Sequence, residues 1–382
     1  MGAKEKKTEL NVLNIILCLL VILIHSMGSA IWQTVASARS YPVFTALFRL
    51  SSFAVQGFIF LSAVKLYMNK SSASYGKFIW RRVKTVFLPY LLYVPIYYIY
   101  KLSVEKRPFD ILYLIKSIFS GNMHAHFYFV ILIMQFYFLF PLFKKLYEKG
   151  SAESLTAVSV AFSLAFQFSV PHALKFLFNI DFTFADRTFL TYLGYWTLGA
   201  YAGMNYDKFK SSVCKTKYAV FICFLLFGAI ICPENYRVMR FSEFVPGFGE
   251  LFFAYTFPAI LFFFIISVML SKLMFFNSGF FVQLNRVSYR VYLIHPFILA
   301  LFDRFTYEFV WNSPALYNIL RYFSVTVLSF GISFLIEKAK DGFLRTRKTL
   351  SRSFWKRSPQ FYRSSPFRAV FSRLRSKCPV RI

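Results

Sequence analysis

The first long apolar segment of the chain carries a stripe of polar residues along one side. At 100° per residue on a helix, Asn14 and His25 point to within ~20° of each other. An ionisable imidazole this deep in an apolar run is costly, and by default it indicates a functional site. The alternative is an imidazole that only hydrogen-bonds a neighbouring helix. The members of the stripe are Asn11, Asn14, Cys18, His25 and Ser29.

Apolar runs of 17 to 25 residues recur along almost the whole chain, and each is long enough to cross ~30 Å of hydrocarbon as a helix. They predict an all-α fold, a polytopic transmembrane helical bundle with about ten spanning helices. The first run is too long and too polar for a signal peptide, so we expect it to be retained. The expected spans are residues 11–33, 43–66, 85–101, 127–147, 154–170, 188–205, 217–233, 251–272, 289–308 and 317–337.

Lysine and arginine occupy alternate loops, as the positive-inside rule requires. The pattern predicts that both termini lie in the cytoplasm and that the protein is a multi-pass protein of the cell (plasma or inner) membrane. His25 then lies ~22 Å along the first helix, in the outer half of the bilayer. The basic clusters fall in residues 4–7, 65–84, 144–149, 208–217 and 272–290, with a weak exception at 101–116.

The composition agrees with a membrane protein, because 57% of the 382 residues are hydrophobic and only 16% are charged. A formal net charge of +29 could suggest nucleic acid. The basic residues lie in short loops and the C-terminal tail, without a recognition motif, so we expect no nucleic-acid partner. The five cysteines form no CxxC pair, and we expect neither a disulfide framework nor a metal site.

The C-terminal tail is strongly basic. From Lys338 onward it contains fourteen basic residues and one acid, Asp341, interleaved with aromatic residues. Such a segment is attracted to anionic lipid by ~1 kcal/mol per basic residue near the surface. We therefore expect a membrane domain of residues 1–337 and a basic, aromatic-containing cytoplasmic tail of residues 338–382, disordered and lying on the inner leaflet.

Two further groups are placed where they could carry chemistry. His295 precedes Pro296 in an apolar run, and proline frees a helix carbonyl, so a kink and a local polar pocket are expected. Arg81, Arg82 and Lys84 lie at the cytoplasmic mouth of the third span. They are either a positive-inside anchor or a clamp for the phosphates of a cytosolic donor.

A histidine pair precedes the fourth span, at its outer entrance. His124 and His126 are two residues apart, so their side chains would diverge by ~200° on a helix. No third ligand is apparent, which argues against a metal site. Taken alone, the pair is best explained by packing beside aromatic residues.

These segments, in this order, resemble the acyltransferase-3 family of integral membrane O-acyltransferases over roughly residues 10–337. In that family an arginine in the first span is followed, after ten residues, by a histidine. His25 matches the histidine, and Asn14 stands at the arginine position. The other matching stretches are residues 57–63, 81–90, 126–141, 192–199 and 288–296; the last, Ser-Tyr-x-x-Tyr-Leu-x-His-Pro, is the most specific.

The resemblance implies transfer of an acyl group, commonly acetyl, from cytosolic acyl-CoA to a hydroxyl of an extracytoplasmic polysaccharide or lipid-linked sugar. Acyl-CoA is the donor substrate, and no permanently bound cofactor is implied. His25 would be the general base or a transient acyl carrier. The implied CoA-phosphate ligands are Arg81, Arg82 and Lys84, and the implied acceptor-side and pocket residues are His126, Ser288, Tyr292, His295 and Asn14.

Two departures from the family pattern accompany this match. Asn14 can hydrogen-bond but cannot neutralise a phosphate. Ala63 replaces a glycine, which we expect to limit close helix approach. The alternative function is export or flipping of a surface-polysaccharide intermediate, as discussed for intercellular-adhesin members of the family. Export would require a continuous polar path, which the sequence does not reveal.

Overall fold

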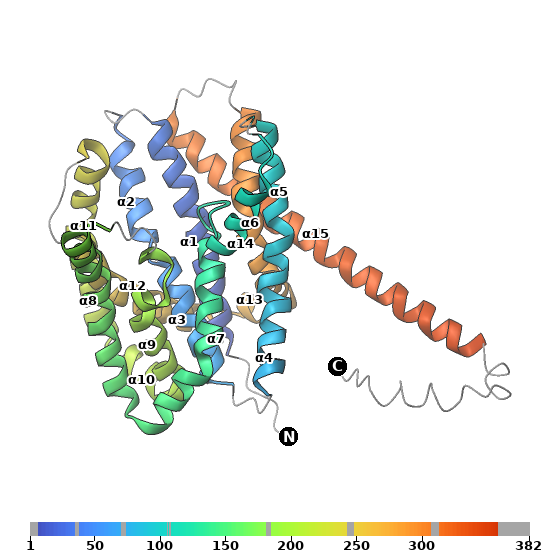
Figure 1. Cartoon of the computed structure of the whole chain (residues 1–382), viewed down its shortest axis with the longest axis horizontal. Helices are drawn as coiled ribbons and strands as arrows, with labels where there is room; N and C mark the ends of the chain where they lie inside the picture. The colour runs from blue at the N-terminus through green and yellow to red at the C-terminus, as the bar shows by residue number, and fades with distance from the viewer. Residues whose placement is uncertain are drawn as a thin grey trace. The chain divides into compact units, whose positions relative to one another are not determined.

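The computed structural model describes residues 7–34, 38–69, 74–104, 106, 108–180, 185–242, 248–306 and 313–357. In these residues the chain forms helices and no strand (Figure 1). It divides into two compact units, Met1–Phe330 and Gly331–Ile382. The helical bundle belongs to the first unit. The described helices confirm the all-α fold predicted from the sequence.

The helices of the described residues follow one another with short connections. In chain order they are α1 (Thr8–Gln33), α2 (Tyr41–Ser51), α3 (Ala54–Tyr67), α4 (Tyr75–Arg82), the π-helical η1 (Val83–Phe87), α5 (Leu88–Val104), α6 (Ile111–Ser120), α7 (Tyr128–Lys149), α8 (Ala152–Phe178), the 3₁₀ turns η2 (Ala185–Arg187) and η3 (Phe189–Tyr192), α9 (Leu193–Met204), α10 (Tyr206–Lys215), α11 (Lys217–Phe241), α12 (Phe248–Leu270), α13 (Met274–Asn277), α14 (Gly279–Thr306) and α15 (Pro314–Arg357).

Seven helical segments in the described part of the chain are long and apolar enough to cross a membrane, so the chain is a multi-pass membrane protein. The three other expected spans also contain helices, α5, α9 and α14. α5 and α9 have only 17 and 12 residues, and α14 carries several charged side chains. The seven segments are Thr8–Trp32, Tyr41–Tyr67, Tyr128–Lys149, Ala152–Phe178, Lys217–Phe241, Gly249–Leu270 and Pro314–Phe343.

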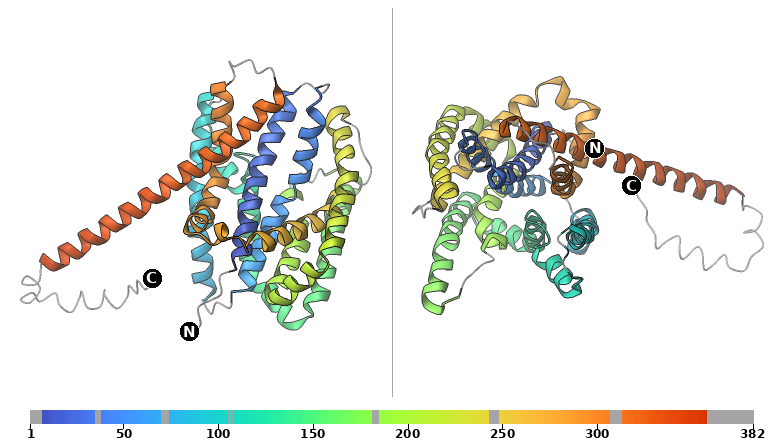
Figure 2. Two further views of the ribbon diagram at one scale, coloured as in Figure 1. Left: turned by 180° about the vertical axis from the view of Figure 1, so that it is seen from behind. Right: turned by 90° about the horizontal axis from the view of Figure 1, so that it is seen from above.

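α1 lies toward the middle of the bundle, where it packs against α2, α3, α12 and α14. Figure 2 shows it surrounded by other helices when the molecule is seen from above. Its apolar residues are buried on several sides, with Leu13 and Leu17 almost fully enclosed. The polar stripe is therefore held inside the protein, where each of its side chains needs a partner.

α3 and α9 approach each other closely at two glycines of α9. A Cβ added at Gly199 would lie 2.4 Å from the Phe60 carbonyl oxygen and 2.8 Å from the Cβ of Ala63, and one at Gly203 would lie 2.6 Å from the Val64 carbonyl oxygen. Gly199 and Gly203 thus form a small-xxx-small contact surface. The expectation that Ala63 limits close approach is wrong, because the facing glycine supplies the missing space.

The predicted tail is helical where the structure describes it. Residues 338–357 continue α15, and Lys340 lies 4.0 Å from Glu337 one turn earlier. The expectation of disorder is therefore wrong for this stretch. Residues 358–382 of the predicted tail lie outside the described residues.

Candidate active site

Four histidines from three separate segments meet at one place in the bundle. His25 comes from α1, His295 from α14, and His124 and His126 from the turn before α7. The ring of His25 lies 5.1 Å from that of His295, 5.9 Å from that of His126 and 6.2 Å from that of His124, measured between centroids. His25 is half-buried, whereas His126 and His295 are buried. We call these four residues the histidine cluster.

His295 is oriented by its own helix. Pro296 has no N–H, so the Tyr292 carbonyl loses its usual helix partner. The Nδ1 atom of His295 lies 2.9 Å from this oxygen and 3.2 Å from the Val291 carbonyl oxygen. Carbonyl oxygens only accept hydrogen bonds, so Nδ1 carries the hydrogen and Nε2 of the neutral ring keeps a lone pair. That Nε2 atom is buried without a hydrogen-bond partner among the described residues.

Tyr97 of α5 completes the break in α14. Its hydroxyl donates to the Leu293 carbonyl at 3.0 Å and accepts from the Phe297 amide at 3.0 Å. In an unbroken helix these two backbone groups would bond each other, so the hydroxyl is inserted into the helix ladder. The kink expected at Pro296 from the sequence is thus stabilised by a side chain from another helix. The Tyr97 ring also lies 5.1 Å from His124.

The turn that carries His124 and His126 is fixed at both ends. It begins at Gly121, whose φ of 69° favours glycine and whose added Cβ would lie 2.7 Å from the Tyr128 Cα. At its other end, the Tyr292 hydroxyl donates to the His126 carbonyl. Arg187 binds the start of the turn through the Ser120 carbonyl, at 3.0 Å. The turn therefore holds both histidines against α1 and α14.

The two histidines of the turn share a hydrogen bond. Their Nδ1 atoms are 2.9 Å apart, so one ring donates and the other accepts. Burial lowers the pKa of His124 to about 3, with the nearby His25 and Lys101 adding to the effect. Burial also lowers the pKa of His126 well below its ordinary value. Both rings are therefore neutral at neutral pH, and each can accept as well as donate a proton.

The polar stripe of α1 faces α14 along its length. The Asn14 amide donates to the Asn285 Oδ1 atom at 2.9 Å and to the Ser288 hydroxyl at 2.8 Å. Asn285 in turn donates to Asn11 at 3.1 Å. The Cys18 thiol lies 3.7 Å from the Ser288 carbonyl. Asn14 therefore joins α1 to α14 at the arginine position of the family, with its amide nitrogen donating two hydrogen bonds.

The basic residues lie apart from the histidine cluster, on α4 and η1. Arg81 and Lys84 are exposed, and Arg82 lies over the Tyr137 ring of α7 at 4.7 Å. η1 places a π-helical turn between α4 and α5, a feature that is frequent at functional sites.

Two tyrosines of α14 connect this basic segment to the histidines. The Tyr289 hydroxyl donates to the Val86 carbonyl of η1 at 2.7 Å. The Tyr289 ring stacks on that of Tyr292 at 6.0 Å, and Tyr292 lies 5.2 Å from His126. The structure thus brings His25, His126, Tyr292 and His295 together and joins Asn14 to Ser288. It does not bring the basic residues into this group; Tyr289 and Tyr292 lie between η1 and His126.

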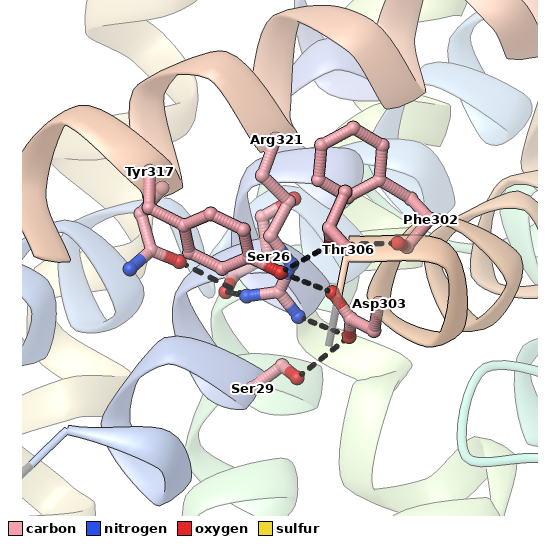
Figure 3. Close-up of polar contacts among 8 residues, drawn as sticks. Ser26, Ser29, Phe302, Asp303, Thr306, Tyr317 and Arg321 are labelled. Atoms are coloured by element: carbon pink, nitrogen blue, oxygen red, sulfur yellow. Dashed lines mark hydrogen bonds and ion pairs between the residues drawn. The ribbon is translucent and has the colours of Figure 1, made fainter. Parts of the chain in front are cut away.

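A charged pair near the cluster was not singled out from the sequence. Arg321 of α15 donates to the Asp303 carboxylate of α14 at 2.7 Å and to the Ser26 carbonyl of α1 at 3.2 Å (Figure 3). Ser26 is the residue after His25. The signal for Arg321 was present in the sequence, since an arginine near the start of an apolar span is rare without a role.

No group of three histidine, cysteine, aspartate or glutamate side chains suited to a metal ion exists in the part of the chain that the structure describes. The histidine cluster instead places the neutral imidazoles of His124 and His126 beside the half-buried His25. Such an arrangement can move protons or carry an acyl group.

Residues 7–338 match the acyltransferase domain of the acyltransferase-3 family. The chain belongs to this family. It is a multi-pass membrane protein of the O-acyltransferase type. This acyltransferase-3 chain is 24% identical to the "Putative membrane-bound acyltransferase YfiQ" of Bacillus subtilis, covering 88% of this chain and 93% of the relative. It is 25% identical to the "Probable poly-beta-1,6-N-acetyl-D-glucosamine export protein" of Staphylococcus epidermidis, covering 81% and 86%. No solved structure matches the chain.

Proposed function

We propose that the protein transfers an acyl group, commonly acetyl, from cytosolic acyl-CoA to a hydroxyl of an extracytoplasmic polysaccharide or lipid-linked sugar. The observation that carries the proposal is the meeting of His25, His124, His126 and His295 in a chain of the acyltransferase-3 family. The name of the staphylococcal relative supports a glycan as the acceptor.

The proposal requires a definite orientation in the membrane. We infer ten spanning helices with both termini in the cytoplasm, because basic residues alternate between loops. The basic segment of α4 and η1 then faces the cytosol, and the end of α1 beyond His25 faces outward. The tail from residue 338 would lie near anionic lipid of the inner leaflet, where its positive charge is favourable.

The chemistry is an acyl exchange between oxygen and sulfur. The sugar hydroxyl loses its proton to an imidazole, its oxygen forms the ester bond, the carbon–sulfur bond of the thioester breaks, and the proton ends on the CoA thiol. His25 is half-buried and its ring lies near those of the other three histidines, which suits the base or the acyl carrier. The Nδ1 atom of His295 is bonded to the backbone, so its Nε2 atom carries the lone pair. This lone pair would support His25 in its role as the group that accepts the proton.

The donor would be held by Arg81, Arg82 and Lys84 through the CoA phosphates, which arginine binds in a bidentate manner. The exposure of Arg81 and Lys84 supports this role, because a phosphate can reach them from solvent. Asn14 contributes no charge to donor binding. Its bonds to Asn285 and Ser288 instead support a role in aligning α1 with α14.

The test is His25→Ala, with His172→Ala as the matched control. His172 is the one histidine of the chain outside the histidine cluster, and it lies exposed on α8. We expect His25→Ala to abolish ester groups on the surface glycan, as measured by mass spectrometry, while the level of inserted protein stays normal. His172→Ala should leave the esters unchanged. Unchanged acylation in His25→Ala would overturn the proposal.

Export of a polysaccharide intermediate is the second candidate function, favoured by the name of the staphylococcal relative. It predicts a different phenotype. Deletion of the gene would prevent the polymer from appearing outside the cell, whereas loss of a transferase would leave the polymer outside and remove only its ester groups.

A further inference from the structure

The Asp303–Arg321 pair is open on one side only. The Asp303 side chain is 23% exposed and the Arg321 side chain is 0% exposed, although their charged atoms are 2.7 Å apart. The guanidinium is enclosed by the Ser26 carbonyl at 3.2 Å and the Asn318 amide oxygen at 3.0 Å. The pair therefore shows an anionic, acceptor-only face to its surroundings, with the cation sealed behind it.

The carboxylate has capacity for a further hydrogen bond. Besides Arg321, its neighbours are the Ser29 hydroxyl at 3.5 Å and the Tyr317 hydroxyl at 3.3 Å (Figure 3). Both distances exceed the 2.5–3.0 Å usual for O–H···O bonds. A carboxylate accepts about four hydrogen bonds, so Asp303 can take a shorter one from a ligand hydroxyl.

Asp303 lies beside the outward continuation of the α1 stripe. Ser29 is one turn beyond His25, about 6 Å along the helix. Trp32 is seven residues beyond His25 and returns to within ~20° of the same face. Its side chain is 90% exposed. His25, the Asp303–Ser29 contact and the Trp32 ring thus follow one another along one side of α1.

We propose that Asp303 and Trp32 form a binding site for the acceptor, a neutral polyhydroxylated sugar chain, at the outer end of α1. The carboxylate accepts a hydrogen bond from a ring hydroxyl, and the indole packs against the apolar C–H face of a sugar ring. Arg321 is a positioning residue that holds the carboxylate in place through their 2.7 Å contact. The inference rests on the proposed function, because it places the sugar next to His25.

The chemistry of the site selects a sugar without negative charge. An anionic polymer would meet the Asp303 carboxylate, while the only guanidinium in contact with that carboxylate among the described residues is buried. A negative charge on the polymer and the Asp303 carboxylate would repel each other on contact. Arg321 cannot turn outward to offset this repulsion without breaking its bonds to α1 and α14. Neutral hydroxyl groups carry no such cost.

The experiment measures sugar binding directly. Purified full-length protein in lipid nanodiscs is titrated calorimetrically with an oligosaccharide of β-1,6-linked N-acetyl-D-glucosamine. We expect Trp32→Ala to weaken binding by at least about tenfold, because the stacking surface is lost. Trp32→Tyr should restore most of the affinity. Phe176→Ala is the matched control, since Phe176 is an equally exposed aromatic residue of α8, and it should bind as the wild type does.

Asp303→Asn tests the carboxylate and should weaken binding of the same probe by at least about tenfold. Its thermal stability is measured alongside, and Trp32→Ala decides the matter if Asp303→Asn does not fold. Absence of binding by the wild type, or equal affinity in wild type and Trp32→Ala, would overturn the inference. Trp32-dependent binding without any ester formation would leave it standing and overturn the proposed transferase instead. Ester formation that is unchanged in Trp32→Ala would leave the proposed transferase standing and overturn the sugar-binding site.

Discussion

At the scale of single residues, the Tyr97 hydroxyl controls the shape of α14 beside the histidine cluster. It replaces the hydrogen bond that the Leu293 carbonyl and the Phe297 amide would otherwise make with each other. His295 lies between these two positions, so its ring direction depends on the same break. One oxygen atom from α5 therefore determines the local geometry of a residue on α14.

We expect Tyr97→Phe to lower both stability and transfer. The substitution removes both hydrogen bonds of the hydroxyl, so α14 must either leave the Leu293 carbonyl and the Phe297 amide unpaired, at about 1–3 kcal/mol for each group, or straighten and shift His295 to pair them with each other. The melting temperature in detergent should fall by several degrees, and ester formation should fall with it.

Tyr100→Phe is the control for this substitution. The Tyr100 ring also contacts Phe297, with centroids 5.6 Å apart. Its hydroxyl makes no hydrogen bond to any residue that the structure describes, so its loss should change neither measurement. Equal melting temperatures for Tyr97→Phe and the wild type would mean that α14 bends without the hydroxyl.

The sequence predicted some of these residues and not others, for a physical reason. The α1 stripe is a local pattern, because helix periodicity alone places Asn14 and His25 on one face. The partners of the stripe lie more than 250 residues away on α14, and no periodicity encodes that distance. The two-residue spacing of His124 and His126 argues against a shared face on a helix, and the neighbouring aromatic residues favour a packing role for the pair. The structure places both in a turn, where that spacing argument does not hold.

At the scale of elements, the contact between α3 and α9 depends on glycine. The α9 backbone is close enough to α3 that a methyl group at Gly199 would lie 2.4 Å from the Phe60 carbonyl oxygen. This oxygen is backbone, so it cannot move without moving α3. α3 packs in turn against α1, which carries His25.

Gly199→Ala should therefore destabilise the bundle by about 1–3 kcal/mol, the usual cost of overpacking. Gly279→Ala is the matched control, since nothing lies within 4 Å of a Cβ added there. Thermal unfolding in detergent compares the two. A melting temperature for Gly199→Ala equal to that of Gly279→Ala would contradict the packing argument.

The hydrophobic pattern predicts where helices occur better than it predicts their type or their first residue. Most long apolar runs became long helices, because a run of about twenty apolar residues has few other stable forms in hydrocarbon. η1 has no comparable signature, since a π-helical turn uses ordinary residues. α14 was expected to begin near residue 289 but begins at Gly279, because its inner turns are polar and bind the α1 stripe.

At the scale of the whole molecule, the proposed orientation determines which substrate meets which end. Single cysteines at two exposed positions test it. Arg39→Cys, near the start of α2, should react with a membrane-impermeant maleimide in intact cells, and Lys84→Cys in η1 should react only after the cells are opened. Labelling is read by the mass shift of the protein, in a background without the native cysteines. Reaction of Lys84→Cys in intact cells would show that the orientation is the opposite of the one proposed.

The position of the histidine cluster between the two ends has an electrical consequence. In the proposed transfer, a proton leaves a sugar hydroxyl on the outer side and finishes on a CoA thiol on the inner side. Each turnover then carries one positive charge inward through part of the membrane field, and a complete crossing corresponds to about 2.3 kcal/mol per 100 mV. A cell with a negative interior would thus use its membrane voltage to favour ester formation on its outer surface.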